Sequence, residues 1–163
     1  MAPAVTTILV PTDFSETADA ALEYAAALAA RLGASLHLLH VFADPYRGAP
    51  GADLYAPVMP DLQERALADA RADLVTRLAA HQTTAHPGTC ALVSGLTAKQ
   101  IAQYANDHAI GLIVMGTHGR RGVAHLLLGS VAEHVVRIAP CPVLTVRGNP
   151  HPADTRTPAT RVA

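Results

Sequence analysis

Short runs of apolar residues alternate along the chain with longer segments in which apolar positions recur every three or four residues. The short runs are rich in β-branched residues and are bounded by turn-forming residues, so they predict buried strands. Five strands are expected, at Val5–Pro11, Ser35–Phe42, Cys90–Gly95, Gly111–Gly116 and Pro142–Val146. Because these runs are apolar throughout, they predict a parallel sheet that is covered on both faces.

The segments between the strands have the apolar spacing of helices. Ser15 or Thr17 can cap the first helix, and Gly33 suits its end. Thr97 and Gln100 have the spacing of a capping box at the start of a later helix. The side chains expected to face the core from three of these helices are Ala18, Leu22, Ala25, Ala29 and Leu32, then Leu62, Ala66, Ala70, Leu74 and Leu78, and last Val131, Val135 and Ile138.

The regular alternation of strand and helix predicts an α/β fold. We expect a single-domain, doubly wound, five-stranded parallel sheet with helices on both faces, of the Rossmann-like kind. The domain should span residues 1–147, with a disordered tail at 148–163 and a long loop at 43–57. Sheets of this kind bind ligands beyond the carboxyl ends of their strands, so the segments after the first, second and fourth strands should meet in one crevice.

Composition and charge narrow the classes of function. The 163 residues include 12 basic and 13 acidic side chains, with a formal net charge of −1, which is no electrostatic footprint for nucleic acid or an anionic membrane. No segment approaches the ~20 apolar residues of a spanning helix, and a secretory signal is not expected at the start of the chain. Cys90 and Cys141 form no spacing motif and are expected to be reduced core residues. A cytoplasmic protein is expected.

Four glycines lie between the fourth strand and the last helix, at positions 116, 119, 122 and 129, and Ser130 follows the last of them. A strand, a loop and a helix start in this order form an anion-binding arrangement, because the first turn of a helix presents unpaired N–H groups. Gly129 would let a phosphate reach those donors, and Ser130 adds a hydroxyl group. Turn formation explains any single glycine, but the whole set favours phosphate binding.

Three other kinds of site are disfavoured. A P-loop needs Gly-Lys-Ser/Thr, whereas the only lysine, Lys99, lies in another helix, and no dinucleotide GxGxxG motif follows the first strand. The nine histidines suggest metal binding, but none of them forms a ligand pair on one helix face. His37 and His40 are three apart on a strand and should point to opposite faces. No metal site made of protein side chains is therefore expected.

The spacing Gly116-x2-Gly119-x9-Gly129-Ser130 resembles the nucleotide loop of the ATP-binding branch of the universal stress proteins. The segments "ILVPTDFSE", "GLIVMGTHGRRG" and "SVAEHVVRIAPCPVLTVR" are also similar to that family, so the resemblance covers about Val5 to Arg147. Gly111 departs from the family, which more often has an aspartate there. This position lies at the end of the strand that is remote from the ligand.

The resemblance implies an ATP site, with magnesium carried on the phosphates. Asp13 would contact the ribose or adenosine end, although an aspartate there can also simply brace the turn. The backbone of Val41 would read the adenine edge. The other residues that the resemblance implies are Pro11 and Thr12 beside the adenosine, Met115 and Gly116 under the nucleoside, His118, Gly119 and Arg120 around the phosphates, and Gly129, Ser130 and Val131 at the helix start.

A binding module is favoured over an enzyme. The sequence offers a phosphate cradle but no recognisable Ser-His-Asp set and no metal cluster, so no catalytic residue is assigned. The resemblance implies a stress-response sensor or regulator whose bound ATP sets its conformation or its partners. Two alternatives stay open: a slow ATPase, and a protein-interaction domain that binds no nucleotide.

The last strand predicts a homodimer. Pro142–Val146 ends the folded part of the chain and carries no charge, and no later segment is suited to covering it. A bare apolar edge invites pairing with another chain. The resemblance implies the same contact, because this family commonly dimerises through its fifth strands.

Overall fold

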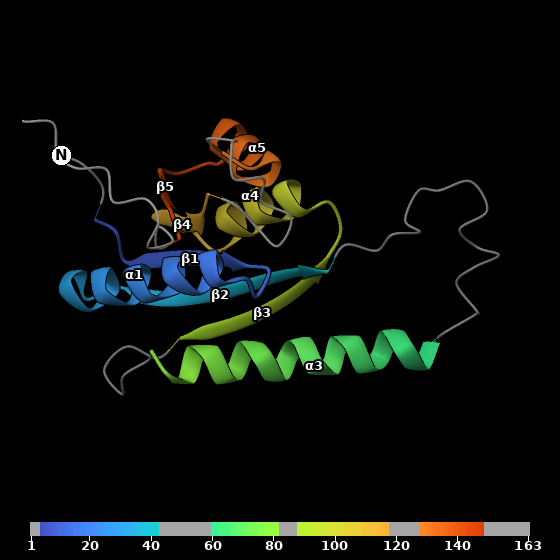
Figure 1. Cartoon of the computed structure of the whole chain (residues 1–163). Helices are drawn as coiled ribbons and strands as arrows, with labels where there is room; N and C mark the ends of the chain where they lie inside the picture. Colours follow the sequence, from blue (N-terminus) through green and yellow to red (C-terminus); the bar gives the residue numbers. More distant parts are fainter. Residues whose placement is uncertain (1–3, 43–59, 82–87, 118–127, 149–163) are drawn as a thin grey trace, which may run out of the picture.

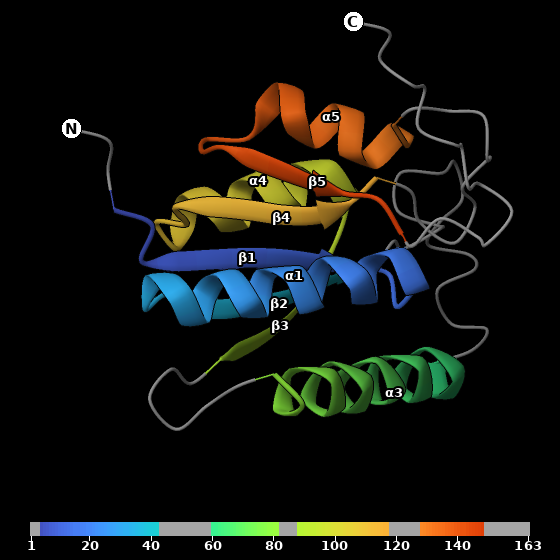
Figure 2. The same ribbon diagram turned by 60° about the vertical axis from the view of Figure 1, so that its left-hand side comes forward.

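Five parallel strands form one sheet in the order β3-β2-β1-β4-β5. The computed structural model describes residues 4–42, 60–81, 88–117 and 128–148; the expected loop at 43–57 and residues 149–163 of the expected tail lie outside them. The strands are β1 (Thr7–Thr12), β2 (Ser35–Phe42), β3 (Thr89–Ser94), β4 (Leu112–Gly116) and β5 (Val143–Val146). The expected strands are therefore confirmed, and β3 and β5 lie at opposite edges (Figure 2).

Two helices pack on each face of the sheet. The helices are α1 (Glu16–Leu32), α3 (Pro60–Ala79), α4 (Thr97–Asp107) and α5 (Ser130–Ile138). Buried residues of α1 and α3 form one core cluster with the sheet, and buried residues of α4 and α5 form a second. Figure 1 shows the course of these four helices along the sheet. On β1, Ile8 and Val10 belong to the first cluster and Leu9 to the second. Both faces are thus apolar, which explains why the strand sequences do not alternate.

The ends of α1 agree with the sequence, whereas the start of α4 does not. Ser15 is the N-cap of α1, and Gly33 ends that helix in the left-handed conformation, with φ of 66°. The capping box expected at α4 is wrong, because Leu96 is its N-cap and makes no side-chain cap hydrogen bond. Gly95, with φ of 144°, turns the chain immediately after β3. The helix therefore begins one residue before the position that a Thr97 cap would require.

Several expected core positions are exposed. Leu32 and Ile138 are 50% and 40% exposed, Val131 is 39% exposed, and Ala66 also faces solvent. Each of these residues belongs to the apolar stripe predicted for its helix, but its side chain is exposed rather than buried against the sheet. On α5 the buried residues are Ala132 and Val135, so its covered face is rotated relative to the expected one. No helix in the described part of the chain is long and apolar enough to cross a membrane.

Gly116 ends β4 directly against the first turn of α1. A Cβ at this position would lie 2.8 Å from the Thr17 Cγ2 atom and 3.1 Å from the Thr17 carbonyl oxygen. Real Cβ atoms do not approach other atoms as closely as the first of these distances. The absence of a side chain at residue 116 therefore lets α1 pack against the end of β4.

We expect Gly116→Ala to lower the free energy of unfolding by about 1–3 kcal/mol, the usual cost of overpacking. Denaturant unfolding would measure this loss. Adding Thr17→Ser removes the Cγ2 atom and should recover part of the stability, with Thr17→Ser alone as the control. Full wild-type stability in Gly116→Ala would contradict the packing explanation.

The two histidines of β2 point to opposite faces, as the sequence predicts. The His37 Nδ1 atom lies 3.0 Å from the hydroxyl oxygen of Tyr104 in α4, and the Tyr104 ring stacks on the His108 ring. On the other face, the His40 Nδ1 atom lies 2.7 Å from the Thr12 carbonyl oxygen. Burial, and then the nearby His108, lower the pKa of His37 below its usual value of 6.5. The folded state therefore disfavours protonation of His37 relative to the unfolded chain.

Stability should fall as the pH is lowered below about 6.5. In that range the unfolded chain takes up a proton on His37 that the folded chain resists, so acid favours unfolding. Chemical denaturation between pH 5.5 and pH 7.5 would measure the effect. His37→Gln should reduce this pH dependence, whereas His134→Gln, at an exposed position of α5, should not. An unchanged pH dependence in His37→Gln would contradict the assignment.

Both cysteines are free, and both are half-buried rather than fully inside the core that the sequence predicts for them. Cys90 packs against the cluster under α1 and α3, and Cys141 packs against the cluster under α4 and α5. Burial raises the pKa of each thiol. Because the thiolate is the nucleophilic form, these residues fit a packing role.

Candidate functional site

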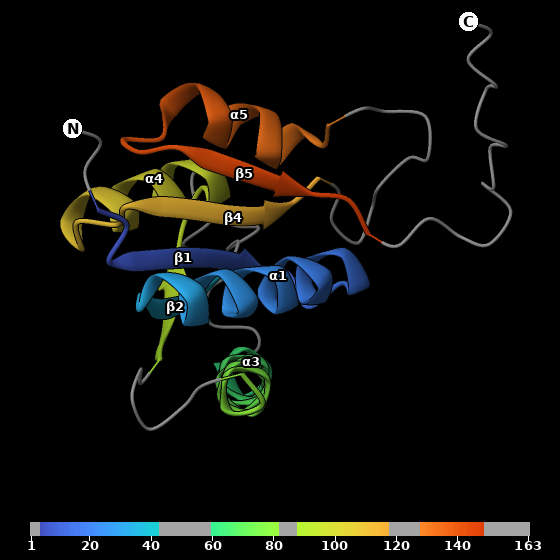
Figure 3. The same cartoon turned by 90° about the vertical axis from the view of Figure 1, so that its left-hand side faces the viewer.

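The carboxyl ends of the parallel strands define one end of the sheet, where α1 and α5 begin (Figure 3). The strand order reverses between β1 and β4, because β1 lies between β2 and β4 in the sheet. The carboxyl ends of β1 and β4 therefore lie side by side, but residues 118–127 of the segment after β4 lie outside the described residues. The expected segment after β2, from residue 43 onward, lies outside the described residues.

Thr117 connects three elements at this end of the sheet. Its N–H donates to the Val146 carbonyl oxygen at 2.8 Å, and its carbonyl oxygen accepts the Gly129 N–H at 2.7 Å. The residue is 4% exposed, so both hydrogen bonds are shielded from water. The start of α5 is consequently fixed beside the ends of β4 and β5.

The start of α5 has no side-chain cap. Gly129 is its N-cap, and the first helical hydrogen bond runs from the Glu133 N–H to the Gly129 carbonyl oxygen. Because the Gly129 N–H donates to Thr117, the N–H groups without helical acceptors are those of residues 130–132. The backbone of Gly129, with φ of −72° and ψ of 155°, is open to any residue. An unusual backbone angle is therefore not the reason for a glycine here.

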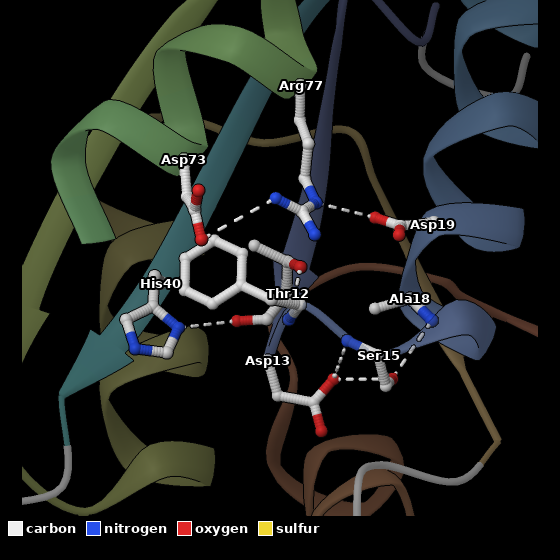
Figure 4. Close-up of polar contacts among 9 residues, drawn as sticks. Thr12, Asp13, Ser15, Ala18, Asp19, His40, Asp73 and Arg77 are labelled. Atoms are coloured by element: carbon white, nitrogen blue, oxygen red, sulfur yellow. Dashed lines mark hydrogen bonds and ion pairs between the residues drawn. The ribbon is translucent and has the colours of Figure 1, made fainter. Parts of the chain in front are cut away.

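Asp13 braces the turn between β1 and α1. Its Oδ1 atom accepts hydrogen bonds from the Ser15 N–H at 3.1 Å and from the Ser15 hydroxyl at 2.6 Å (Figure 4). The Ser15 oxygen in turn accepts the Ala18 N–H at 3.3 Å. The bracing role that the sequence left open is therefore present, and it fixes this carboxylate at the carboxyl end of β1.

Two residues close to Asp13 in the structure, His40 and Phe14, were absent from the predicted site, and both contact Thr12. Thr12 is 7% exposed, and its carbonyl oxygen can only accept, so the His40 Nδ1 atom carries the hydrogen of their 2.7 Å contact. Phe14 has a φ of 64°, in the left-handed region, and its N–H donates to the Thr12 hydroxyl oxygen at 3.0 Å. No local spacing signals these contacts, because His40 belongs to a different strand and the positive φ lies at a residue with a bulky side chain.

The other predicted residues fall into two groups. Pro11, Val41 and Met115 are buried residues of β1, β2 and β4. His118, Gly119 and Arg120 lie outside the described residues. Among the residues that are described, no three His, Cys, Asp or Glu side chains lie together in a way that could hold a metal ion.

Comparison with known proteins gives one consistent result. The sequence profile of the universal stress protein family matches residues 4–147. A universal stress protein of Thermus aquaticus is 36% identical over 141 residues, which cover 86% of this chain and 98% of the relative.

Solved structures of the same family share the fold. The structure of the universal stress protein UspA from Lactobacillus plantarum superposes with a TM-score of 0.79 at 32% identity, covering 89% of this chain and 99% of the other. A universal stress protein in complex with cAMP superposes with a TM-score of 0.61 at 25% identity, covering 90% of this chain and 99% of the other.

Proposed function

The chain belongs to the universal stress protein family, and on this premise we propose that it is a cytoplasmic, ATP-binding regulator of the stress response. The observation that carries the proposal is the start of α5, which has a glycine N-cap and no side-chain cap, fixed through Thr117 beside the end of β4. The triphosphate would bind there, with magnesium on its phosphates. A relative in complex with cAMP supports an adenine nucleotide as the ligand class.

The contrast between α1 and α5 also supports this position for the phosphates. Both helices begin at the carboxyl end of the sheet, but the Ser15 hydroxyl of α1 accepts a first-turn N–H. In α5 the N-cap is Gly129, so no N-cap side chain accepts a hydrogen bond from the N–H groups of residues 130–132. An anion at this helix start would satisfy them and would also interact favourably with the helix dipole.

The rest of the proposed site follows the residues named from the sequence. Asp13 would contact the adenosine end with Pro11 and Thr12, and the main chain of Val41 would read the adenine. The remaining proposed contacts are Met115 and Gly116 under the nucleoside, His118, Gly119 and Arg120 around the phosphates, and Ser130 and Val131 at the helix start. Packing against Thr17 is enough to explain the glycine at position 116. A substitution at Gly129 is therefore the more informative test of nucleotide binding.

Nucleotide released from the purified protein on denaturation would test the proposal directly. We expect an adenine nucleotide, identified by chromatography, and ATP binding by calorimetry once the protein has been stripped. The absence of both would favour an interaction domain without nucleotide. Turnover of ATP with magnesium within minutes would instead favour the slow ATPase.

We expect Gly129→Val to weaken ATP binding at least tenfold, because its side chain would occupy the space of a phosphate at the helix start. The backbone at this position accommodates any residue, and a poorer N-cap costs about 1 kcal/mol, so the variant should still fold. Calorimetry would measure binding, and thermal unfolding would serve as the folding control. Wild-type affinity in Gly129→Val would place the phosphates elsewhere.

Ser130→Ala should weaken ATP binding less, by about 1 kcal/mol, which corresponds to roughly a fivefold higher Kd for one lost hydrogen bond. The backbone N–H of residue 130 remains in this variant, so only the hydroxyl contribution is lost. A Kd equal to that of the wild type would remove the hydroxyl from the site without affecting the Gly129 test.

We also propose that the protein is a homodimer that pairs through β5. This strand is at the edge of the sheet, and all four of its residues are only half-buried. The neighbouring helix α5 exposes further apolar area at Val136 and Ile138. Two copies related by a two-fold axis would cover both edges with one self-complementary contact.

Thr145→Pro provides a specific test of this dimer. The carbonyl groups of Pro142 and Val146 accept hydrogen bonds from the chain at β4, and backbone groups alternate in direction along a strand. The Thr145 N–H therefore points to the outer edge, where proline is tolerated within a protomer. By light scattering at micromolar concentration, we expect a mass near two chains for the wild type and near one for Thr145→Pro. A wild-type mass near one chain would contradict the proposal.

A further inference from the structure

Phe14 has a backbone conformation that a bulky residue rarely adopts. Its φ of 64° lies in the left-handed region, where steric hindrance disfavours residues with a Cβ. Such a conformation persists only when the surrounding structure holds it. The position matters because Phe14 lies between Asp13 and Ser15, which are joined by two hydrogen bonds to the Asp13 Oδ1 atom.

Thr12, His40 and Arg77 are among the residues that contact Phe14. Its N–H donates to the Thr12 hydroxyl oxygen at 3.0 Å. Its ring packs on the His40 imidazole, with centroids 4.5 Å apart and ring planes inclined by 31°. The Cζ atom of Arg77 lies 5.0 Å from the centre of the same ring, within the range of a cation–π interaction. The Phe14 ring therefore lies between a β2 side chain and an α3 side chain.

Arg77 is itself anchored to two helices. Its Nε atom lies 2.8 Å from the Asp19 Oδ1 atom in α1, and its Nη1 atom lies 3.7 Å from the Asp73 Oδ2 atom in α3 (Figure 4). The Arg77 side chain is 27% exposed, against 46% and 56% for the two carboxylates. The guanidinium is thus fixed between α1 and α3, where it also meets the Phe14 ring.

We propose that Arg77 is a positioning residue for the nucleotide site, acting through Phe14 to hold Asp13 in place. The hydrogen bond from the Ser15 N–H to Asp13 closes a ring that passes through the backbone of Phe14. If Phe14 left the left-handed region, that ring would open and the carboxylate would lose its orientation. This inference rests on the proposed function, since it assigns to Asp13 a contact with the nucleotide.

Arg77→Met tests the inference, because it keeps much of the side-chain bulk and removes the charge. We expect a two- to fivefold higher Kd for ATP, the range that corresponds to an exposed cation–π interaction. Arg77→Lys keeps a cation and should retain most of the affinity. Arg71→Met is the matched control, since Arg71 is an exposed arginine of the same helix. An unchanged Kd in Arg77→Met, with a wild type that binds ATP, would overturn the inference.

A double-mutant cycle separates positioning from general stability. Phe14→Gly keeps a residue that adopts positive φ without strain but removes the ring. If Arg77 acts through that ring, Arg77→Met should have no further effect on the Kd in the Phe14→Gly background. Independent, additive effects would overturn the inference. All affinities should be measured where circular dichroism shows that each variant is folded.

Amide resonances of the nucleotide-free protein distinguish this inference from the proposed function. The Phe14 and Ser15 amide signals report the two hydrogen bonds of the turn. They should shift in Arg77→Met and not in Arg71→Met. If the wild type bound no ATP, the proposed function would fail. The shifts in Arg77→Met would still show that Arg77 positions the turn that contains Asp13. Unchanged signals in Arg77→Met would overturn the inference.

Discussion

The main-chain hydrogen bonds of Thr117 hold β4, β5 and the start of α5 together at the carboxyl end of the sheet. One residue joins the end of β5 to the end of β4 and fixes the start of α5 beside both, through two short hydrogen bonds. Because these are main-chain bonds at a buried residue, water competes little for them. The start of α5 is thereby held at the point where the strand order reverses, which is where sheets of this class bind ligands.

Among the helices that begin at this end, α1 and α5 differ in how the N–H groups of their first turns are satisfied. In α1 the Ser15 hydroxyl accepts a first-turn N–H and is itself bound by Asp13, so the cap and the carboxylate form one unit. In α5 a glycine takes the cap position, and its own N–H is directed to Thr117. A side chain thus caps the start of α1, whereas the start of α5 keeps N–H donors that can bind an anion.

Separate groups of aromatic side chains lie on the two faces of the sheet. On one face, His37, Tyr104 and His108 form an aromatic cluster that joins β2 to α4, and burial lowers the pKa of His37. On the other face, His40 and Arg77 both contact Phe14, next to Asp13. A helix that packs chiefly on β2 and β3 thereby reaches the turn after β1 through one long side chain.

The sequence by itself determined the elements and the class of the sheet, since both depend on local periodicity. Apolar runs predicted the strands within two residues, and Ser15 and Gly33 predicted the ends of α1 because caps are local structures. Tertiary packing decided the rest. The covered face of α5, the contact that requires Gly116 and the Arg77–Phe14 pair each depend on segments that are distant in the chain. No spacing within one segment encodes which neighbour it will meet, so only the folded structure could assign those roles.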